Sequence, residues 1–146
     1  MGIRIEYLGG IVCASVDWNA FAVQHVERNT AGPVFQMDIH ELATVKTVHQ
    51  ACPRIGTTTL GFPRQPHSFQ GNRLGSADPR FNTFWSGLRF MSLTQTQTAI
   101  LECVPAAGWN QEVLSGLKQL AAAMGWQILT TQLHLHERWP SRRSRW

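Results

Sequence analysis

Short apolar runs alternate with segments of helical periodicity along most of the chain. The runs with the composition of strands are residues 11–16, 33–39, 57–62, 98–104 and 126–138. The segments that place apolar side chains at helical spacing are residues 17–29, 40–50, 81–91 and 111–124. Strand and helix therefore alternate with short connections from residue 11 to residue 138. This order predicts an α/β sheet with right-handed crossovers and helices on both faces.

The same pattern predicts which side chains the helices bury. In the helix at 40–50 we expect the inward positions to be Leu42, Val45 and Val48. In the helix at 81–91 they are Phe81, Phe84, Trp85, Leu88 and Met91. The helix at 111–124 has the clearest apolar face: Val113, Leu114, Leu117, Leu120, Ala121 and Met124. Asn110 is suited to cap this helix and Gly125 to end it, while Asp17 or Asn19 would cap the first helix.

The length and composition indicate a single domain. A chain of 146 residues can bury one core but is short for two. It contains no apolar run long enough to span a membrane, and residues 1–10 lack the features of a signal peptide. We therefore expect a soluble intracellular protein with no membrane contact, nuclear if the organism is eukaryotic.

The cysteines and histidines indicate neither a disulfide framework nor a metal site. Three scattered cysteines have no CxxC pairing, and Cys13 and Cys103 lie in apolar runs typical of small buried side chains. His134 and His136 share one face of a predicted strand, but no third ligand accompanies them, so we predict no metal site.

The positive charge belongs to the end of the sequence. The net charge is +4, and residues 138–146 contain four arginines and no acid. The remaining residues carry nine basic and nine acidic side chains, which cancel. This arginine-rich tail is either a solvated terminus or a segment that contacts phosphates.

Several polar residues follow the predicted strands, where α/β folds bind their ligands. Asp17 would accept hydrogen bonds from ribose hydroxyls or cap a helix, and Trp18 would stack on an adenine or join the core. Asp38 would accept from an adenine amino group or cap the helix that starts near Glu41. Glu102 ends an apolar strand, where a carboxyl group can hold a proton near neutral pH, or it would pair with a tail arginine.

Several motifs occur in an order that resembles the cytosine-specific DNA methyltransferases that modify carbon 5. These motifs are SVDWN, QMDI, GFPRQPHSFQG, DPR, LECVPA and SRRSRW, and they extend over residues 11–146. In that family the catalytic loop usually begins G-x-P-C-Q-x-x-S, a later strand ends in E-N-V, and a further segment reads Q-R-R-x-R. The resemblance implies a Rossmann-like methyltransferase sheet that uses S-adenosylmethionine and acts on DNA.

The resemblance also implies a role for individual residues. Asp17 and Trp18 match the residues that hold the ribose and adenine of the cofactor. Asp38 and Ile39 match residues that contact the adenine further, and Pro63 matches the cofactor-site proline that opens the catalytic loop. Glu102 would contact the ring nitrogen of the target cytosine, while Arg143 and Arg145 would position the nucleotide once it has left the duplex. The residues expected to contact nucleic acid are Gln65, Ser68, Arg142, Arg143 and Arg145.

The sequence departs from the family at the nucleophile. Carbon 5 of cytosine becomes reactive when a thiolate adds to carbon 6, but Arg64 occupies the position of that thiol. A guanidinium stays protonated and has no lone pair for attack. Cys52 precedes the strand and would lie at the wrong end of the sheet. Cys103 should point away from Glu102 on its strand.

Other departures accompany this one. The family's first strand, glycine-rich turn and helix have no proper counterpart, because IEYLGG is followed directly by the next strand. Ser141 replaces the glutamine of the arginine motif, and the sequence ends before the region that reads DNA. We therefore expect residues 1–146 to be a single, partial catalytic domain without a target-recognition region.

Three interpretations follow. The first is an inactive cytosine-5 methyltransferase-like domain whose S-adenosylmethionine binding is weak or lost. The second is a non-catalytic module that binds nucleic acid through Arg64, Arg138, Arg142, Arg143 and Arg145. The third is an active enzyme that works by another route or with a partner chain supplying the missing elements.

Overall fold

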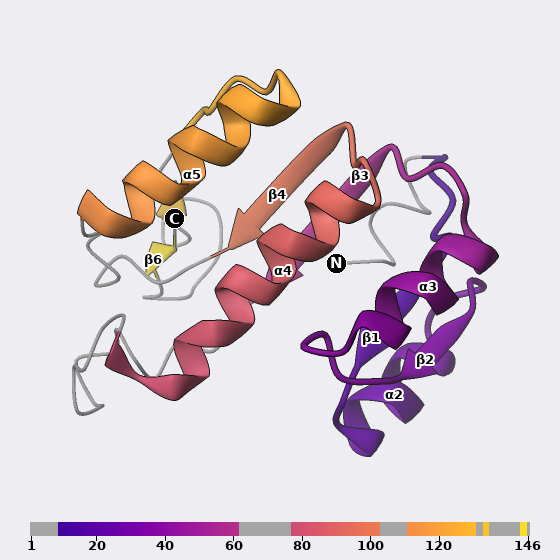
Figure 1. The fold of residues 1–146 in the computed structure, drawn as a ribbon. Helices are drawn as coiled ribbons and strands as arrows, with labels where there is room; N and C mark the ends of the chain where they lie inside the picture. The colour runs from indigo at the N-terminus through magenta and orange to yellow at the C-terminus, as the bar shows by residue number, and fades with distance from the viewer. Residues whose placement is uncertain (1–8, 62–76, 103–110, 131–132, 135–143, 146) are drawn as a thin grey trace.

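The computed structural model describes residues 9–61, 77–102, 111–130, 133–134 and 144–145. Its elements are β1 (Ser15–Asp17), α2 (Ala20–Glu27), β2 (Val34–Gln36), α3 (Leu42–Ala51), β3 (Thr57–Gly61), the 3₁₀ turn η2 (Pro79–Phe81), α4 (Asn82–Leu93), β4 (Thr98–Glu102), α5 (Gln111–Met124), β5 (Leu133–His134) and β6 (Ser144–Arg145). The alternation of strand and helix confirms the predicted α/β class (Figure 1). Within these residues no helix is both long and apolar enough to cross a membrane.

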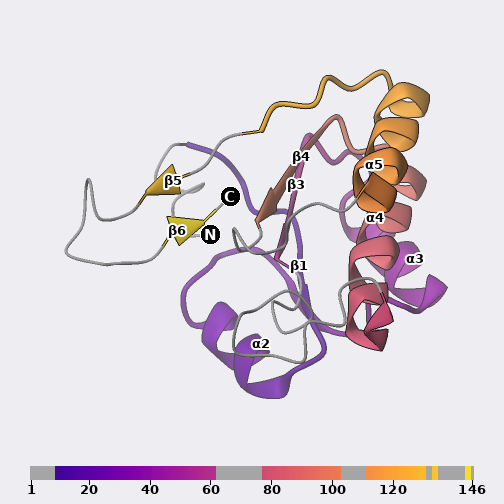
Figure 2. The same ribbon diagram turned by 90° about the vertical axis from the view of Figure 1, so that its left-hand side faces the viewer.

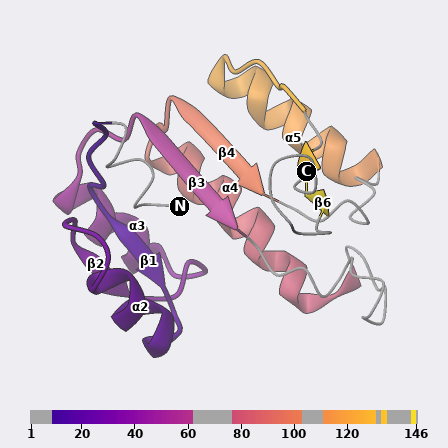
Figure 3. The same ribbon diagram turned by 180° about the vertical axis from the view of Figure 1, so that it is seen from behind.

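The described strands form hydrogen bonds in separate pairs. β1 pairs with β2 and β3 pairs with β4, and both pairs are parallel. β5 and β6 form a short antiparallel pair. Figure 2 shows α2 on one side of the strands and α3, α4 and α5 on the other, as two parallel βαβ units require. The strands β1, β3 and β4 point in the same direction (Figure 3).

The helix ends follow the local sequence. Asn19 caps α2, since its side chain accepts hydrogen bonds from the backbone N–H groups of Phe21 at 2.9 Å and Ala22 at 3.2 Å. Gly125 ends α5 with a φ of +69°, a value that favours glycine. These two boundaries were predicted correctly from the residue types.

One hydrophobic cluster lies under both parallel pairs. Its buried members come mainly from α3 and α4 and their ends: Val45, Val48, Cys52, Ile55, Phe81, Phe84, Leu88, Phe90 and Met91. Phe84 is central, because its ring stacks on Phe81 at 5.1 Å and meets Trp85 edge-on at 5.0 Å. Partly buried side chains from all four parallel strands pack against the cluster. The core therefore joins the two strand pairs that no ladder joins among the described residues.

Two details of the predicted packing are wrong. Leu42 was expected to point inward but is 51% exposed, because the buried face of α3 runs through Thr44, Val45 and Val48. The strand predicted at 126–138 is absent from residues 126–130. Leu129 is 93% exposed there, and no described strand pairs with residues 126–130. Among the described residues of 126–138, only β5, at residues 133–134, is a strand.

The expectation that no disulfide forms is also wrong. Cys13 and Cys52 are joined by a disulfide, with Cα atoms 5.8 Å apart and a separation of 39 positions in sequence. Cys13 precedes β1 and Cys52 follows α3 ahead of β3, so the bond ties the ends at which these strands begin. The sequence spacing gives no sign of this pairing because it depends on the folded positions of two distant segments.

Removing this disulfide is predicted to destabilise the chain. Cys52→Ser frees a long loop in the unfolded state, and we expect the free energy of unfolding to fall by about 2–4 kcal/mol under oxidising conditions. Urea titration followed by circular dichroism measures this change. With a reductant present, the native chain and the variant should unfold at similar urea concentrations. An unchanged midpoint under oxidising conditions would contradict the role of the bond.

Candidate functional site

A cavity of about 1110 Å³ lies between the β1 and β3 segments. Residues 10–18 line one side and residues 54–61 the other. Side chains of the core helices, including Val48, Phe90 and Met91, form an apolar wall. The turn after β2 closes the end to which the strands point. The volume is slightly above the range of pockets that hold small organic ligands, about 300–1000 Å³.

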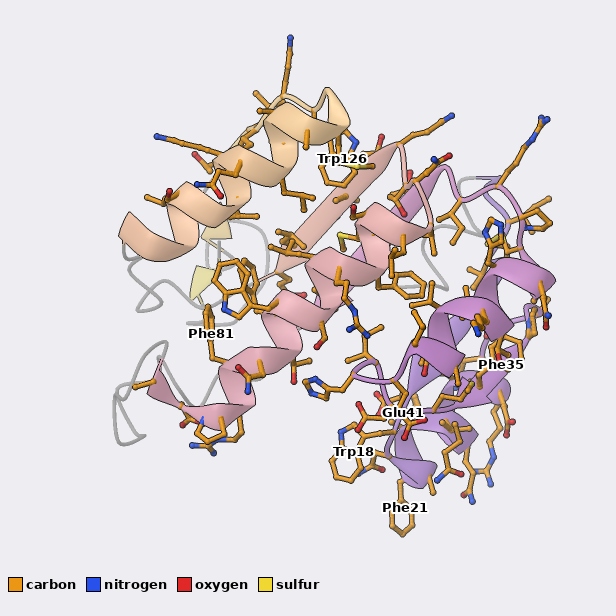
Figure 4. The ribbon with its side chains drawn as sticks, viewed as in Figure 1. Trp18, Phe21, Phe35, Glu41, Phe81 and Trp126 are labelled. Atoms are coloured by element: carbon orange, nitrogen blue, oxygen red, sulfur yellow. A yellow bond between two sulfur atoms is a disulfide. The ribbon has the colours of Figure 1, made fainter. Side chains whose placement is uncertain are left out.

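Asp17 and Trp18 lie at the carboxyl end of β1 and line this cavity. The backbone carbonyl of Asp17 accepts from Met37 N–H at 3.1 Å, and its carboxylate accepts from Asn19 N–H at 2.8 Å. The alternative role expected for Asp17 was to cap α2, but the residue that caps this helix is Asn19. Trp18 is 74% exposed and projects from the turn that joins β1 to α2 (Figure 4), so it is not a core residue.

Asp38 and Ile39 belong to the turn after β2, and both line the same cavity. The Asp38 carboxylate accepts from His40 N–H at 2.9 Å, and its backbone carbonyl accepts from Glu41 N–H at 3.1 Å and from the Thr44 hydroxyl. The Asp38 side chain therefore holds the turn and does not cap α3. Ile39 is half-buried against the core. Four of the five predicted cofactor residues thus meet at one cavity.

His40 connects this turn to α4. Its Nδ1 lies 2.7 Å from the hydroxyl oxygen of Ser86, and its Nε2 lies 3.4 Å from that of Thr83. Arg89 donates a hydrogen bond to the His40 backbone carbonyl at 3.1 Å. Sequence reasoning missed this residue, because a histidine at the start of a helical segment has no pattern that indicates a bridge to a helix forty residues later. The bridge fixes one end of the cavity relative to the core.

Glu102 lies at the carboxyl end of β4, opposite Gly61 in the register of the parallel pair. It is half-buried and does not line the cavity described above. Gly61 does line it and directly precedes the segment that contains Pro63 and Arg64. The strand ends therefore bring Glu102 to the start of the predicted catalytic loop.

The Asp78-Pro79-Arg80 motif has a structural role at the start of α4. The buried Asp78 carboxylate accepts from the backbone N–H of Arg80 at 2.9 Å and from its guanidinium at 2.9 and 2.6 Å. These hydrogen bonds, together with the attraction between the opposite charges, raise the pKa of Arg80 above its usual value. The motif thus orients the helix that forms the apolar wall of the cavity.

The acidic and the basic side chains of the cavity lie at opposite ends of it. Asp17 and Asp38 lie at the end where the strands finish, whereas Arg54 lies at the end where β3 begins. Two carboxylates with an exposed aromatic ring suit a ligand that offers hydroxyl, amino or cationic groups beside a flat ring. This is the chemistry of a nucleoside carrying positive charge, so the residues present fit S-adenosylmethionine.

The other predicted site residues are not brought to this cavity by the described structure. The predicted residues that fall outside the described part are Pro63, Arg64, Gln65, Ser68, Arg138, Arg142 and Arg143. Arg145 lies in β6, which pairs with Leu133 of β5. Cys52 lies at the opposite end of the strands from Asp17, as predicted, and there it forms the unexpected disulfide. Cys103 falls outside the described residues.

Comparison with known proteins gives one matching family and a similar solved structure. The model of the C-5 cytosine-specific DNA methylases matches residues 2–131. No curated protein matches the chain. A solved structure that is similar is a triple mutant of DNMT2 from Spodoptera frugiperda, at 21% identity and a TM-score of 0.47. The match covers 84% of the present chain and 37% of that chain, so the present chain spans little more than a third of its length.

Proposed function

We propose that this chain, which belongs to the family of C-5 cytosine-specific DNA methylases, is a degenerate member that keeps part of the cofactor site and has lost the catalytic nucleophile. The family uses S-adenosylmethionine and acts on cytosine in DNA. The observation that carries the proposal is Arg64, which stands in GFPRQPHS where the family has a cysteine.

The cavity supports retained, weak binding of the cofactor. Asp17 and Asp38 supply carboxylate acceptors, while Trp18 offers an exposed ring and Ile39 an apolar contact. When bound in this family, S-adenosylmethionine supplies the methyl group. In this chain the four residues would hold its adenosine part, and Pro63 would border it from the catalytic loop. We expect this affinity to be weak because the sequence has no proper counterpart of the family's glycine-rich turn.

Arg64 cannot replace the missing thiol. Its guanidinium is protonated at every physiological pH and carries no lone pair that can attack carbon 6 of cytosine. Cys52 gives no substitute, since its sulfur is bonded to Cys13 where the strands begin. Glu102 would still contact the cytosine ring, and Arg143 and Arg145 would still position the flipped nucleotide. Without the covalent step these contacts bind the base and leave it unmodified.

The first prediction concerns cofactor binding. Trp18→Ala should weaken the affinity for S-adenosylmethionine roughly 5- to 100-fold, because it removes an aromatic ring from the cavity. Phe21→Ala is the matched control, since Phe21 is also an exposed aromatic, at 82%, but does not line the cavity. Isothermal titration calorimetry of both variants measures the difference. Equal affinities for the two variants would show that Trp18 is not part of the cofactor site.

The second prediction concerns catalysis. With radiolabelled S-adenosylmethionine and duplex DNA, the native chain should incorporate no more methyl groups than Glu102→Ala does. Arg64→Cys should also stay at this background, because the glycine-rich turn of the family is missing together with the nucleophile. Incorporation by the native chain would contradict the proposal. Incorporation by Arg64→Cys alone would show that the loss is confined to one residue.

The arginine-rich tail favours a second candidate function, in which the chain binds nucleic acid without modifying it. Arg64 and the four tail arginines can each contact a phosphate, and Gln65 and Ser68 can add hydrogen bonds. Binding to DNA would place the protein inside the cell, and in the nucleus if the organism is eukaryotic. A partner chain that supplies missing elements remains part of the proposal.

The third prediction tests this candidate through salt dependence. Replacing Arg142, Arg143 and Arg145 by alanine should lower the slope of log affinity against log salt by about 1 for each arginine. Fluorescence anisotropy with a labelled duplex measures the slope. The matched control replaces three exposed cations elsewhere, Arg28, Lys46 and Lys118. If both triple variants change the slope equally, the tail has no special role.

A further inference from the structure

We infer that the disulfide between Cys13 and Cys52 is a reversible thiol latch, which fixes one wall of the cavity when closed and weakens cofactor binding when a thiol opens it. The effect on the cofactor rests on the proposed function, whereas the latch itself can be tested without any ligand. The bond lies in the cavity wall, it can be reached from one side, and few other contacts restrain the segment that it holds.

The segment held by the latch is residues 10–14, which line the cavity and lead directly into β1. No hydrogen bond joins these residues to another residue that the structure describes, and the next one along the chain runs from Ser15 N–H to the Pro33 carbonyl at 2.9 Å. Val12 lies against Gly32, and Cys13 packs partly on the core. Such contacts have no preferred direction and permit sliding. Among the described contacts, the disulfide is therefore the one that fixes this wall.

The other half of the bond is anchored. Cys52 ends α3, and its N–H donates a hydrogen bond to the Val48 carbonyl at 2.8 Å. Both residues belong to the buried core cluster, as does the nearby Ile55. Breaking the disulfide therefore leaves Cys52 in place and frees the segment that carries Cys13.

The freed segment is close to the predicted cofactor residues. β1 has only three residues, so Cys13 lies four positions before Asp17 and five before Trp18. The end of β1 is tied to the next strand by the hydrogen bond from Met37 N–H to the Asp17 carbonyl, at 3.1 Å. A change in the position of Cys13 is thus carried to Asp17 and Trp18 by a very short strand.

The two sulfur atoms differ in access, which determines the course of reduction. Cys13 is half-buried and lines the cavity, whereas Cys52 is only 6% exposed. A small thiolate would attack Cys13 Sγ and form a mixed disulfide, while the electron pair of the broken bond goes to Cys52 Sγ, which takes up a proton. A second thiolate then attacks the sulfur of the attached thiol, and Cys13 leaves and is protonated. Two thiols are thereby oxidised to one small disulfide, and the protein disulfide is reduced to two cysteines.

The surroundings accommodate the reduced pair as well as the oxidised one. Cys52 Sγ lies 3.3 Å from the carbonyl oxygen of Arg54, so the thiol formed by reduction has an acceptor for its hydrogen. A protein that acts on DNA, as proposed, works where thiols are kept reduced, and disulfides in that environment are usually transient or redox-sensing. These properties are those of a reversible switch.

The first experiment tests the latch without cofactor, by treating the native chain with reduced glutathione in the absence of denaturant. Alkylation and mass spectrometry should show two newly free thiols. NMR should show exchange of the Ser15 amide hydrogen faster by about tenfold or more, because this amide follows the freed segment. The Thr98 N–H, which donates to the Gly56 carbonyl in the other strand pair, should change much less. Oxidised glutathione should reverse both changes.

Two variants show whether the effect belongs to this bond. Cys52→Ser should exchange at Ser15 as fast as the reduced native chain and should not respond to glutathione. Cys103→Ser is the matched control, because Cys103 is not part of the bond, and it should respond as the native chain does. Should Cys52→Ser fail to fold, the oxidised and reduced forms of the native chain and of Cys103→Ser give the same comparison.

The second experiment measures the affinity of the oxidised and the reduced native chain for S-adenosylmethionine by isothermal titration calorimetry. Freeing the wall lowers the fraction of molecules in the arrangement that binds, and the apparent affinity falls in proportion. We expect binding to the reduced chain to be weaker by about tenfold. Cys52→Ser should bind like the reduced chain.

Four results would overturn the inference. The first is no new free thiols without denaturant, and the second is unchanged exchange at Ser15. The third is equal acceleration at Ser15 and Thr98, which would indicate a general loss of stability. The fourth is equal affinity of both redox forms for the cofactor. If neither form binds the cofactor while Ser15 responds, the proposed function fails and the latch is confirmed.

Discussion

The packing of the core cluster from α3 and α4 against both parallel strand pairs is the interaction on which the rest of the structure depends. No described ladder connects β1 to β3, so the core formed with Phe84, Leu88, Phe90 and Met91 holds the pairs at a fixed separation. The disulfide between Cys13 and Cys52 ties the ends at which these strands begin, and His40 ties the turn after β2 to α4. The cavity is the space that these three restraints keep open.

Recognition in the cavity is concentrated at the end where the strands finish. There Asp17, Trp18 and Asp38 offer side-chain groups that suit a nucleoside. The wall formed by Val48, Phe90 and Met91 is apolar.

Much of the fold could be predicted from local sequence, and some of it could not. The end of α5 at Gly125 was predicted, and Asn19, which caps α2, was one of the two residues proposed for that cap. The strand predicted at 126–138 is absent from residues 126–130, because a strand needs a neighbouring edge, which periodicity alone does not supply. The disulfide could not be predicted for the same reason, since two segments 39 residues apart meet only in the folded chain.

The candidate site shows the same division. That Asp17, Trp18 and Asp38 line one cavity could be expected because they lie at strand ends, which a parallel sheet brings together, whereas Ile39 was named only through the family resemblance. His40 could not, since its partners lie on α4.

We propose that the cavity holds S-adenosylmethionine at the carboxyl ends of the strands. The most direct measurement is a titration of the ¹⁵N-labelled native chain with S-adenosylmethionine, followed by NMR chemical shifts. We expect saturable shifts at Asp17, Trp18, Asp38, Ile39 and Gly61, and none at Phe21 or Leu129. Shifts that are absent at millimolar cofactor, or that appear only away from these strand ends, would contradict it.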